Sequence, residues 1–595
     1  MKDPRTYYTA LATESARLGA SLQRRYDRLA IVRLIAFFLI VALLIVAWSR
    51  SWQFGLTTSL ILLPLSAYGI RRHLAIGRRA TEAQVKKQIA EGELRALDHH
   101  FSHYPDGKEF IQPGHPYAVD LDIFGPFSLF QFINRTVTSV GARRLADHLS
   151  EPADHAESRQ RRQLGRDLAA DPAWCQEFRT IGHDLRDDPQ NARRLLEWVD
   201  RPSRASGRDV RILRWLAPVL TVMGVWFSFT QAPWQLGLLF FVPAFALLRR
   251  YQETAATEHA YTAEAGKMLQ RYGRLLAHVE GRYPERTVGA SAAVGKLSYY
   301  VSQLDVRYNP FVFLLEISGL WSLQWLYQLD RWRERHRHEL ARWIAELAAA
   351  DARVSWATLR FNRPDWTEPE LTEHPVLDGT GLGHPLLPPD GRITNDIHIR
   401  TDGHIHLVTG SNMAGKSTWL RTVGINIVLA RAGGPVCALL LRTAALQVWT
   451  SMRTQDDLRE STSSFYAELK RLKVIIEAVS TPGQEVFFLL DEILKGTNSR
   501  DRHTGSRALI RQLIREKGAG IIATHDLELA DLEHEPGPDS HGRVENYAME
   551  VQTRDGKLVF DYKLHRGVSR SFNATALMAR MGIKIDPEDI KLTHD

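Results

Sequence analysis

Four apolar runs stand out along this chain, and they fall into two closely spaced pairs. The first pair covers residues 34–48 and 54–70, and the second covers residues 215–230 and 234–248. Each run has 15 to 17 residues, at the short end of the length that crosses a bilayer core of about 30 Å. Since only a few residues separate the members of a pair, each pair is predicted to form a helical hairpin.

Arginine residues lie on both sides of each predicted hairpin. They are Arg24, Arg25, Arg28, Arg33, Arg71, Arg72, Arg78 and Arg79 around the first, and Arg211, Arg214, Arg249 and Arg250 around the second. Because positively charged flanks stay on the cytoplasmic side, the pattern predicts four transmembrane helices in the inner (cytoplasmic) membrane, with soluble domains in the cytoplasm. The alternative is that both hairpins are buried in the core of a soluble protein.

The remaining pattern divides the chain into domains. Leucines at helical spacing, Leu11, Leu18, Leu22 and Leu29, predict an N-terminal amphipathic helix. Proline and glycine punctuate residues 363–392, which we interpret as the linker into the last domain. The domains expected in chain order are an amphipathic helix (1–30), a transmembrane hairpin (31–73), a helical domain (74–210), a second hairpin (211–250), a long-helix region (251–362) and a last domain (363–595).

Apolar strands alternate with helices in that last domain. The segments IHLV at 405–408 and VFFLL at 486–490 are short and apolar, and a third apolar segment ends at His525. Two further segments alternate on either side of Asp555 and Gly556 and predict a β-hairpin. Strands and helices in this order are typical of an α/β domain with a largely parallel sheet.

Composition narrows the function only slightly. The formal net charge of +8 and the pI of about 9.3 favour polyanionic partners, nucleic acid or anionic lipid, without choosing between them. The two cysteines, Cys175 and Cys437, match no zinc or redox spacing. A reducing compartment without a disulfide framework is therefore expected.

A glycine-rich loop follows the predicted strand at 405–408. Residues 410–417, GSNMAGKS, fit the pattern G-x-x-x-x-G-K-[ST], in which backbone N–H groups surround the phosphates of a nucleotide. Lys416 would place its charge on the β and γ phosphates, and the Ser417 hydroxyl would bind Mg²⁺. We predict that ATP is bound by Gly410, Ser411, Asn412, Met413, Ala414, Gly415, Lys416, Ser417 and Thr418. The alternative is a glycine-rich turn without a ligand.

Two acidic residues and a histidine end the next apolar strands. Asp491 and Glu492 follow the strand at 486–490, and His525 ends the strand after it. In phosphate-loop enzymes the first carboxylate binds Mg²⁺ and the second polarises the attacking water. We predict that Ser417 and Asp491 bind the metal, and that Glu492, His525 and Lys416 are catalytic. The alternatives are a helix N-cap for the two acids and a structural role for the histidine.

Four segments carry a family resemblance as a set. They are TGSNMAGKSTWLRTVGINIVLARAGGPVCA, QDDLRESTSSFYAELKRL, LLDEILKGTNSRD and ATHDLELADL, and with them residues 404–530 resemble the MutS ATPase domain of the ABC class. Residues 120–152 are similar to the start of the MutS core domain. The predicted apolar hairpins are placed as in the membrane-associated branch of MutS-related proteins. Together, the hairpins and the resemblance imply a multidomain α plus α/β protein. Its parts are a helical MutS core and lever-like region, two transmembrane helical hairpins and a C-terminal ABC-type P-loop ATPase domain.

The resemblance also implies roles for matched residues. Ser461 and Ser463 of the segment STSSF would reach the γ-phosphate bound to the opposite protomer, so that ATP and Mg²⁺ sit in a composite site of a homodimer. Asn498 belongs to the loop that communicates across that dimer. Ile393 and Asn395 match residues that hold the adenine base. Arg392 stands where the family usually stacks an aromatic ring on adenine, which leaves the nucleotide preference open.

The function expected from these features is a membrane-anchored MutS-like ATPase that acts on DNA, branched or duplex. Relatives that recognise mismatches carry a Phe-x-Glu wedge, and no phenylalanine here has a glutamate two residues later, so direct mismatch reading is not expected. The alternative is a membrane-surface scaffolding or remodelling ATPase without DNA binding. An ABC transporter fits poorly, since STSSF lacks the LSGGQ-type signature.

Overall fold

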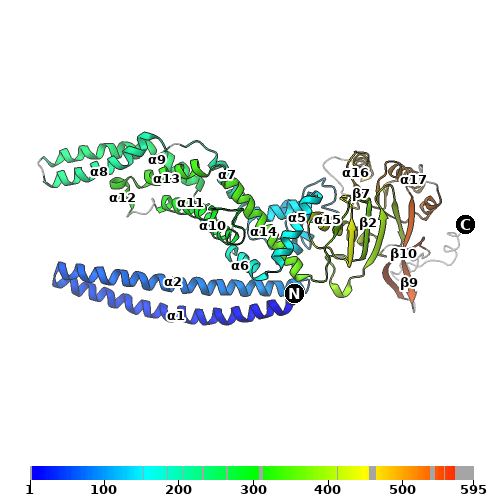
Figure 1. The fold of residues 1–595 in the computed structure, drawn as a ribbon, viewed down its shortest axis with the longest axis horizontal. Helices are drawn as coiled ribbons and strands as arrows, with labels where there is room; N and C mark the ends of the chain where they lie inside the picture. The colour runs from blue at the N-terminus through cyan, green and yellow to red at the C-terminus, as the bar shows by residue number, and fades with distance from the viewer. Residues whose placement is uncertain are drawn as a thin grey trace.

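The computed structural model describes residues 3–151, 153–183, 185, 187–203, 205–230, 233–262, 265–306, 312–411, 413–453, 464–535, 543–554 and 557–569. The molecule is elongated, with helical hairpins at one end and β-sheets at the other (Figure 1). The expectation of a mostly helical chain with a mixed α/β C-terminal part is confirmed.

The first hairpin consists of two long helices, α1 (Pro4–Arg50) and α2 (Trp52–Leu97). Ser51 separates them, and its hydroxyl accepts a hydrogen bond from the N–H of Phe54 at the start of α2. The expected amphipathic helix at 1–30 is not a separate element, because α1 runs unbroken into the apolar run. The helix α2 likewise continues well beyond residue 73, where the hairpin was expected to end.

The second hairpin departs further from the expectation. Its first helix is α8 (Arg208–Thr230), but the return begins as a 3-10 helix, η2 (Trp234–Phe241), before α9 (Val242–Thr262). Two glycines allow α8 and η2 to approach closely, since a Cβ on Gly237 would lie 2.0 Å from the Ser228 hydroxyl and one on Gly224 would lie 2.7 Å from the Gly237 carbonyl. In the described residues, three helical segments, Pro4–Arg50, Trp52–Leu97 and Val210–Thr230, are long and apolar enough to cross a membrane.

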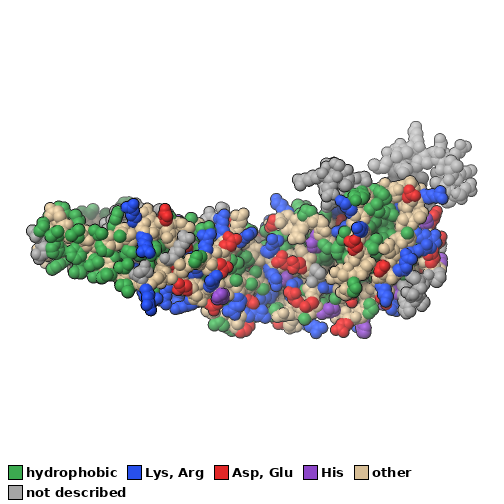
Figure 2. Space-filling model, turned by 90° about the horizontal axis from the view of Figure 1, so that it is seen from above, with side chains coloured by type: hydrophobic (Ala, Val, Ile, Leu, Met, Phe, Trp, Pro, Cys, Tyr) green, Lys and Arg blue, Asp and Glu red, His purple; other side chains and the backbone are tan. Residues whose placement is uncertain are grey.

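Both hairpins project toward the same end of the molecule (Figure 1). Figure 2 shows hydrophobic side chains gathered at that end. Large apolar side chains are exposed on the first hairpin at Leu34, Phe37, Phe38, Ile45, Leu60 and Ile61, and on the second at Trp215, Val222, Trp226, Phe229, Leu239 and Phe245. Exposure of such contiguous apolar surfaces to water is unfavourable, so they mark a site of contact with lipid or protein.

The helical region between the hairpins and the sheets packs around α14 (Leu340–Asn362), which is buried along nearly its whole length and leads directly into the sheets. It contacts α4 (Ser139–Ser150), α5 (His155–Ala169) and α10 (Ala265–Arg282). The other helices of the region are η1 (Lys108–Phe110), α3 (Leu129–Ile133), α6 (Pro172–Gly182), α7 (Pro189–Val199), α11 (Ala290–Asp305), α12 (Val312–Gly319) and α13 (Trp321–His336).

A buried charge cluster ties the first hairpin to this region. Glu93 of α2 has no exposed surface, and its carboxylate lies 2.6 Å from both Arg135 Nε and Arg179 Nη1. The same carboxylate accepts hydrogen bonds from the Tyr104 hydroxyl (2.9 Å) and from the amide of Asn362 on α14 (2.8 Å). Burial alone would raise the pKa of Glu93, but the two arginines outweigh it and lower the pKa to about 2.

Two sheets form the C-terminal part. The smaller has the strand order β1 (Glu370–Leu371), β5 (Leu440–Thr443), β2 (Val376–Leu382), β3 (Asn395–Arg400). The larger has the order β10 (Lys557–Arg566), β9 (Val544–Arg554), β4 (Ile405–Gly410), β8 (Ala519–Thr524), β7 (Val486–Asp491), β6 (Gln447–Ser451). Its strands run parallel except β10, which pairs antiparallel with β9. The predicted largely parallel sheet is therefore present.

Helices connect the strands of the larger sheet. They are α15 (Lys416–Ala432), α16 (Ser464–Val479), α17 (Ser499–Arg515) and the 3-10 helix η5 (Leu527–His534), while η4 (Pro389–Gly391) precedes β3. The central strands β4 and β8 are buried throughout. Since β4, β7 and β8 run parallel, their carboxyl ends meet at one edge of the sheet, where polar side chains of three different segments come together.

Candidate functional site

The loop between β4 and α15 wraps tightly because its residues adopt left-handed conformations. Gly415 has a φ of 101° and Met413 a φ of 68°, while Gly410 has a φ of 153°. A Cβ on Gly410 would lie 2.5 Å from the Met549 carbonyl, so only glycine fits there. Of the predicted phosphate-binding residues, Gly410, Ser411, Met413, Ala414 and Gly415 lie in this loop, and Lys416, Ser417 and Thr418 form the first turn of α15. Asn412 is outside the described residues.

The Lys416 side chain points back into this loop. Its Nζ donates hydrogen bonds to the carbonyls of Gly410 (2.7 Å) and Ser411 (3.0 Å) and lies 3.3 Å from His525 Nε2. Burial lowers the pKa of Lys416 to about 8, and the carboxylates of Asp491 and Glu492 oppose that shift. The ammonium group is therefore still mostly protonated at neutral pH and carries a positive charge at the centre of the loop.

The two predicted metal ligands touch each other. The Ser417 hydroxyl, in the first turn of α15, donates a hydrogen bond to Asp491 Oδ2 at 2.5 Å. Hydroxyl and carboxylate oxygens are the hard ligands that Mg²⁺ prefers, and Mg²⁺ is usually held by one or two protein ligands together with phosphate oxygens. The arrangement of these two side chains beside the loop fits such an ion.

Glu492 forms an ion-paired cluster with its neighbours. Its Oε1 lies 2.9 Å from His525 Nε2, and its Oε2 lies 3.3 Å from Lys495 Nζ. The hydrogen bond from His525 and the charge of Lys495 lower the pKa of Glu492 to about 2, although burial acts in the opposite direction. The three predicted catalytic residues, Lys416, Glu492 and His525, are thus brought together at the edge of the sheet. Lys495, which also belongs to this cluster, was not predicted as a site residue.

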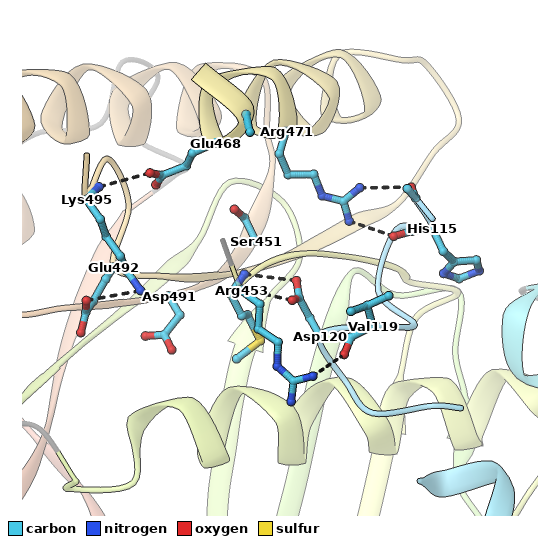
Figure 3. A pocket seen from close by; sticks show the side chains of 13 residues that line it. His115, Val119, Asp120, Ser451, Arg453, Glu468, Arg471, Asp491, Glu492 and Lys495 are labelled. Carbon is cyan, nitrogen blue, oxygen red and sulfur yellow. Dashed lines mark hydrogen bonds and ion pairs between the residues drawn. The ribbon is translucent and has the colours of Figure 1, made fainter. Parts of the chain in front are cut away.

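A cavity of about 160 Å³ opens beside the two carboxylates (Figure 3). Asp491, Glu492 and Lys495 line one side of it. The opposite side comes from the helical region, through Gly114, His115, Val119 and Asp120. Side chains from Ser451, Met452, Arg453 and α16 complete the lining. The site therefore borders directly on a part of the chain that is distant in sequence.

The residues expected to bind the adenine base differ in what their side chains contact. Ile393 is 42% exposed and its side chain is available to a ligand. Asn395, in contrast, uses its amide on the backbone of β10, donating to the Tyr562 carbonyl and accepting from the N–H of Leu564, both at 2.9 Å. Arg392 donates to the Leu387 carbonyl and to Cys437 Sγ, so its guanidinium group is held by its own surroundings.

Tyr562 is a residue of this site that the sequence did not single out. Its φ is 53°, unusual for a non-glycine residue, and its ring stacks on Phe560 with the ring centres 5.8 Å apart. A Cβ on Gly415 would lie 2.9 Å from this ring, so Tyr562 covers the phosphate loop closely. The alternation of Phe560 and Tyr562 on one face of a strand was the signal that was available. The contact between Tyr562 and Gly415, in contrast, could not be predicted from the sequence.

Comparison with known proteins shows which family this chain is related to. Residues 406–584 match the family model described as MutS domain V. The DNA mismatch repair protein MutS of Thermotoga petrophila is 25% identical over 74% of this chain and 60% of its own length. The chain is MutS-related. The DNA mismatch repair protein MSH3 of Phaeosphaeria nodorum is 31% identical over 41% of this chain, and MutS protein homolog 4 of Mus musculus is 29% identical over 38%.

The segment that matches MutS domain V contains the loop, both carboxylates, His525 and Tyr562, whereas Ile393, Asn395 and the cavity lining at residues 114–120 lie outside it. The alignments cover 22% of the Phaeosphaeria protein and 24% of the mouse protein, so this chain spans about a quarter of the length of these relatives. The activities of those whole proteins can therefore only be proposed for this MutS-related chain.

Three other predicted residues are not joined to the site by described contacts. Ser461 and Ser463 lie outside the described residues. Asn498 caps α17, where its Oδ1 accepts from the N–H of Asp501 at 2.9 Å and its Nδ2 donates to the carboxylate of the same residue at 2.7 Å. Their roles across a dimer of this MutS-related protein stay predictions.

Proposed function

We propose that this MutS-related protein binds and hydrolyses ATP with Mg²⁺, in a composite site between two copies anchored in the membrane. The observation that carries the proposal is the convergence of Lys416, Ser417, Asp491 and Glu492 at the ends of parallel strands. Three of these side chains contact one another or the loop, although 74 residues separate Ser417 from Asp491. Loop N–H groups, a lysine and paired oxygen ligands are the parts that phosphoryl transfer requires.

Each side chain then has a specific task. Lys416 leaves the carbonyls of Gly410 and Ser411 and places its charge on the β and γ phosphates. Ser417 and Asp491 would hold Mg²⁺, which would supply positive charge beside the phosphates. Glu492, ionised at neutral pH because of its low pKa, orients and polarises the attacking water. His525 fixes the Glu492 carboxylate through their contact at 2.9 Å.

The adenine site proposed here uses Tyr562 and Ile393. The Tyr562 ring lies over Gly415 and is 43% exposed, so one face is available for stacking on a base. Ile393 adds an exposed apolar side chain. Asn395 acts indirectly, by holding the backbone of residues 562 and 564 in place.

Replacing Lys416 by alanine tests nucleotide binding. The variant is expected to lose at least 10²-fold in affinity for ATP, because a buried charge that would face two phosphates is removed (~3 kcal/mol). Equilibrium binding of a fluorescent ATP analogue to the detergent-purified protein measures the effect. The matched control is Lys517→Ala, a lysine in the turn after α17. Unchanged affinity in Lys416→Ala would contradict the assignment of the loop.

The membrane anchor is proposed from the exposed apolar surfaces of the two hairpins. The apolar part of α1 beyond residue 30 is about 30 Å long at 1.5 Å per residue, which matches the bilayer core. Arginines flank both hairpins, and both hairpins project in the same direction (Figure 1). We propose an inner (cytoplasmic) membrane location, with the soluble parts in the cytoplasm and the η2–α9 segment completing the fourth crossing.

Removing the apolar tips tests the anchor. Where the tips begin, the Tyr26 ring stacks on His73 with ring centres 4.1 Å apart, so a short turn can join residues 30 and 71. A variant with this excision and a matching excision of residues 212–248 is expected to move from the membrane fraction to the soluble fraction and to keep its ATP turnover within a few fold. The single excisions serve as controls, since one hairpin should suffice for retention. A doubly excised protein that stays in carbonate-washed membranes would contradict the proposal.

For the partner on which this ATPase acts, we propose DNA, branched or duplex, without direct mismatch reading. The support is the MutS relationship and the net charge of +8. The same charge also suits anionic lipid headgroups, so a scaffolding ATPase without DNA binding is the second candidate. The salt dependence of DNA binding separates the two, as argued for the Glu492 variant below.

A further inference from the structure

Residues 114–122 of the helical region, here called the strap, lie directly on the α/β domain (Figure 3). The strap lies between α2 and α3 in the sequence. The Asp120 carboxylate, 9% exposed, accepts hydrogen bonds from the Thr450 hydroxyl (2.7 Å) and from the N–H groups of Met452 and Arg453 (both 3.1 Å). One aspartate of the strap therefore binds the end of β6 and the residues that follow it.

A second strap contact comes from α16. The Arg471 Nε donates to the Thr450 carbonyl at 2.8 Å, and its Nη2 donates to the carbonyls of His115 (3.1 Å) and Pro116. A single guanidinium group thus joins α16, β6 and the strap. Arg453 and α16 are the described parts on either side of residues 454–463, which include the predicted γ-phosphate contacts Ser461 and Ser463.

Asp122 extends the strap to the phosphate loop. Its carboxylate lies 3.0 Å from Arg421 Nη1 and 2.8 Å from Arg453 Nη2. Arg421 is on α15, one helical turn after Ser417. Asp122 has a φ of 51°, a left-handed conformation that costs about 1–3 kcal/mol in a non-glycine residue and persists only where its surroundings hold it. The carboxylate therefore fixes α15, the helix that follows the phosphate loop, relative to Arg453 just beyond the end of β6.

We propose that Asp122 is a positioning residue for ATP hydrolysis and that the strap transmits movement between the helical region and the ATP site. This inference rests on the proposed ATPase function. Asp122 touches no reacting group; it acts through Arg421 and Arg453. Without its charge the two guanidinium groups lose their shared partner and repel each other. A misplacement of about 1 Å in the reacting geometry can cost 10²-fold in rate.

Asp122→Asn is the test, measured as a split between binding and turnover in the detergent-purified full chain. We expect kcat to fall at least 10-fold, while the Kd of a fluorescent ATP analogue changes less than threefold. Asp122→Glu should recover part of the loss. In combination with Arg453→Gln, the two losses should not multiply, because both variants remove the same contact. The matched control is Glu370→Gln, which breaks an exposed carboxylate–arginine pair with Arg442 in the same domain and should leave kcat unchanged.

A second measurement follows the transmission itself. Addition of ATP should change amide hydrogen exchange in the strap and at the end of α2, and Asp122→Asn should remove that change while the phosphate loop stays protected by nucleotide. Unchanged kcat in Asp122→Asn, or a parallel loss of affinity, melting temperature and kcat, would overturn the inference and leave only a structural brace. If the unaltered protein neither binds nor hydrolyses ATP, the proposed function itself fails, and the strap inference with it.

Discussion

Replacing Glu492 by glutamine is expected to reduce ATP turnover at least 10²-fold without loss of ATP binding. A glutamine keeps the size of the side chain but cannot accept a proton, and general-base catalysis contributes about 10² to 10⁴-fold. Lys416, Ser417 and Asp491 are unchanged in this variant, so the contacts to the phosphates and to Mg²⁺ remain. Single-turnover hydrolysis and equilibrium binding, measured on the same preparation, separate the two effects.

The matched control for this variant is Glu485→Gln. Glu485 lies just before β7, at the end of the strand opposite to Glu492, and is exposed. The Glu485→Gln variant should hydrolyse ATP at the same rate as the unaltered protein. Ordinary turnover in Glu492→Gln would refute its role, and a loss of ATP binding would show that the carboxylate serves the nucleotide rather than the water.

The same variant decides between DNA and a scaffolding role. A protein that holds ATP without hydrolysing it should accumulate in the ATP-bound form, in which DNA is expected to bind. Binding to phosphates is expected to weaken steeply with salt, since each neutralised phosphate releases counterions. ATP-dependent binding to branched or duplex DNA with a steep salt slope supports the DNA proposal. Absence of binding at physiological salt, with ATP bound, favours the scaffolding ATPase.

Replacing Glu93 by alanine is expected to destabilise the folded protein by about 3–5 kcal/mol, the usual cost of removing one partner from a buried ion pair. Arg135 and Arg179 would both be left without their anionic partner in a site that excludes water. Tyr104 and Asn362 would lose a hydrogen-bond acceptor as well. Chemical unfolding in detergent, or the melting temperature where unfolding is irreversible, measures the change.

Glu91→Gln is the control on the same helix. Glu91 is exposed and pairs with Lys87 at 3.6 Å, so its replacement should cost less than about 1 kcal/mol. Simultaneous replacement of Glu93, Arg135 and Arg179 by apolar residues should recover much of the loss, since no charge then stays buried alone. Equal stability of Glu93→Ala and Glu91→Gln would mean that the cluster contributes nothing to the attachment of the first hairpin.

Sequence reasoning worked where the signal is local. The phosphate loop, the apolar strands and the acids that end them are short patterns, and parallel pairing of β4, β7 and β8 brings them to one edge. Continuity of α1 was missed because the side-chain pattern changes near residue 30 while the sequence there, Leu29 to Val32, contains no helix breaker. The pattern changes there because the side chains of one continuous helix become largely apolar and exposed. That change was interpreted as a boundary between two domains.

Contacts between distant segments were beyond the reach of such patterns. Asp120 and Thr450 are 330 residues apart, and Asp122 and Arg421 are 299 apart, so no periodicity relates them. The return of the second hairpin was expected as one helix, but Pro233 precedes it and Gly237 allows a close approach that favours the tighter η2. Tyr562 was overlooked for the same reason as the strap, because its importance comes from the residue that it covers.

The length of α1 has a consequence for the anchored protein. Residues 4–30, between the helical region and the apolar tip, extend about 40 Å at 1.5 Å per residue. The potential of an anionic membrane surface decays within a Debye length, about 8 Å at physiological ionic strength. In the arrangement we propose, the ATP site thus lies several screening lengths from the headgroups. The charge of the lipid headgroups would determine how the apolar tips insert into the membrane. The affinity of the anchored protein for ATP would be the same in neutral and in anionic bilayers.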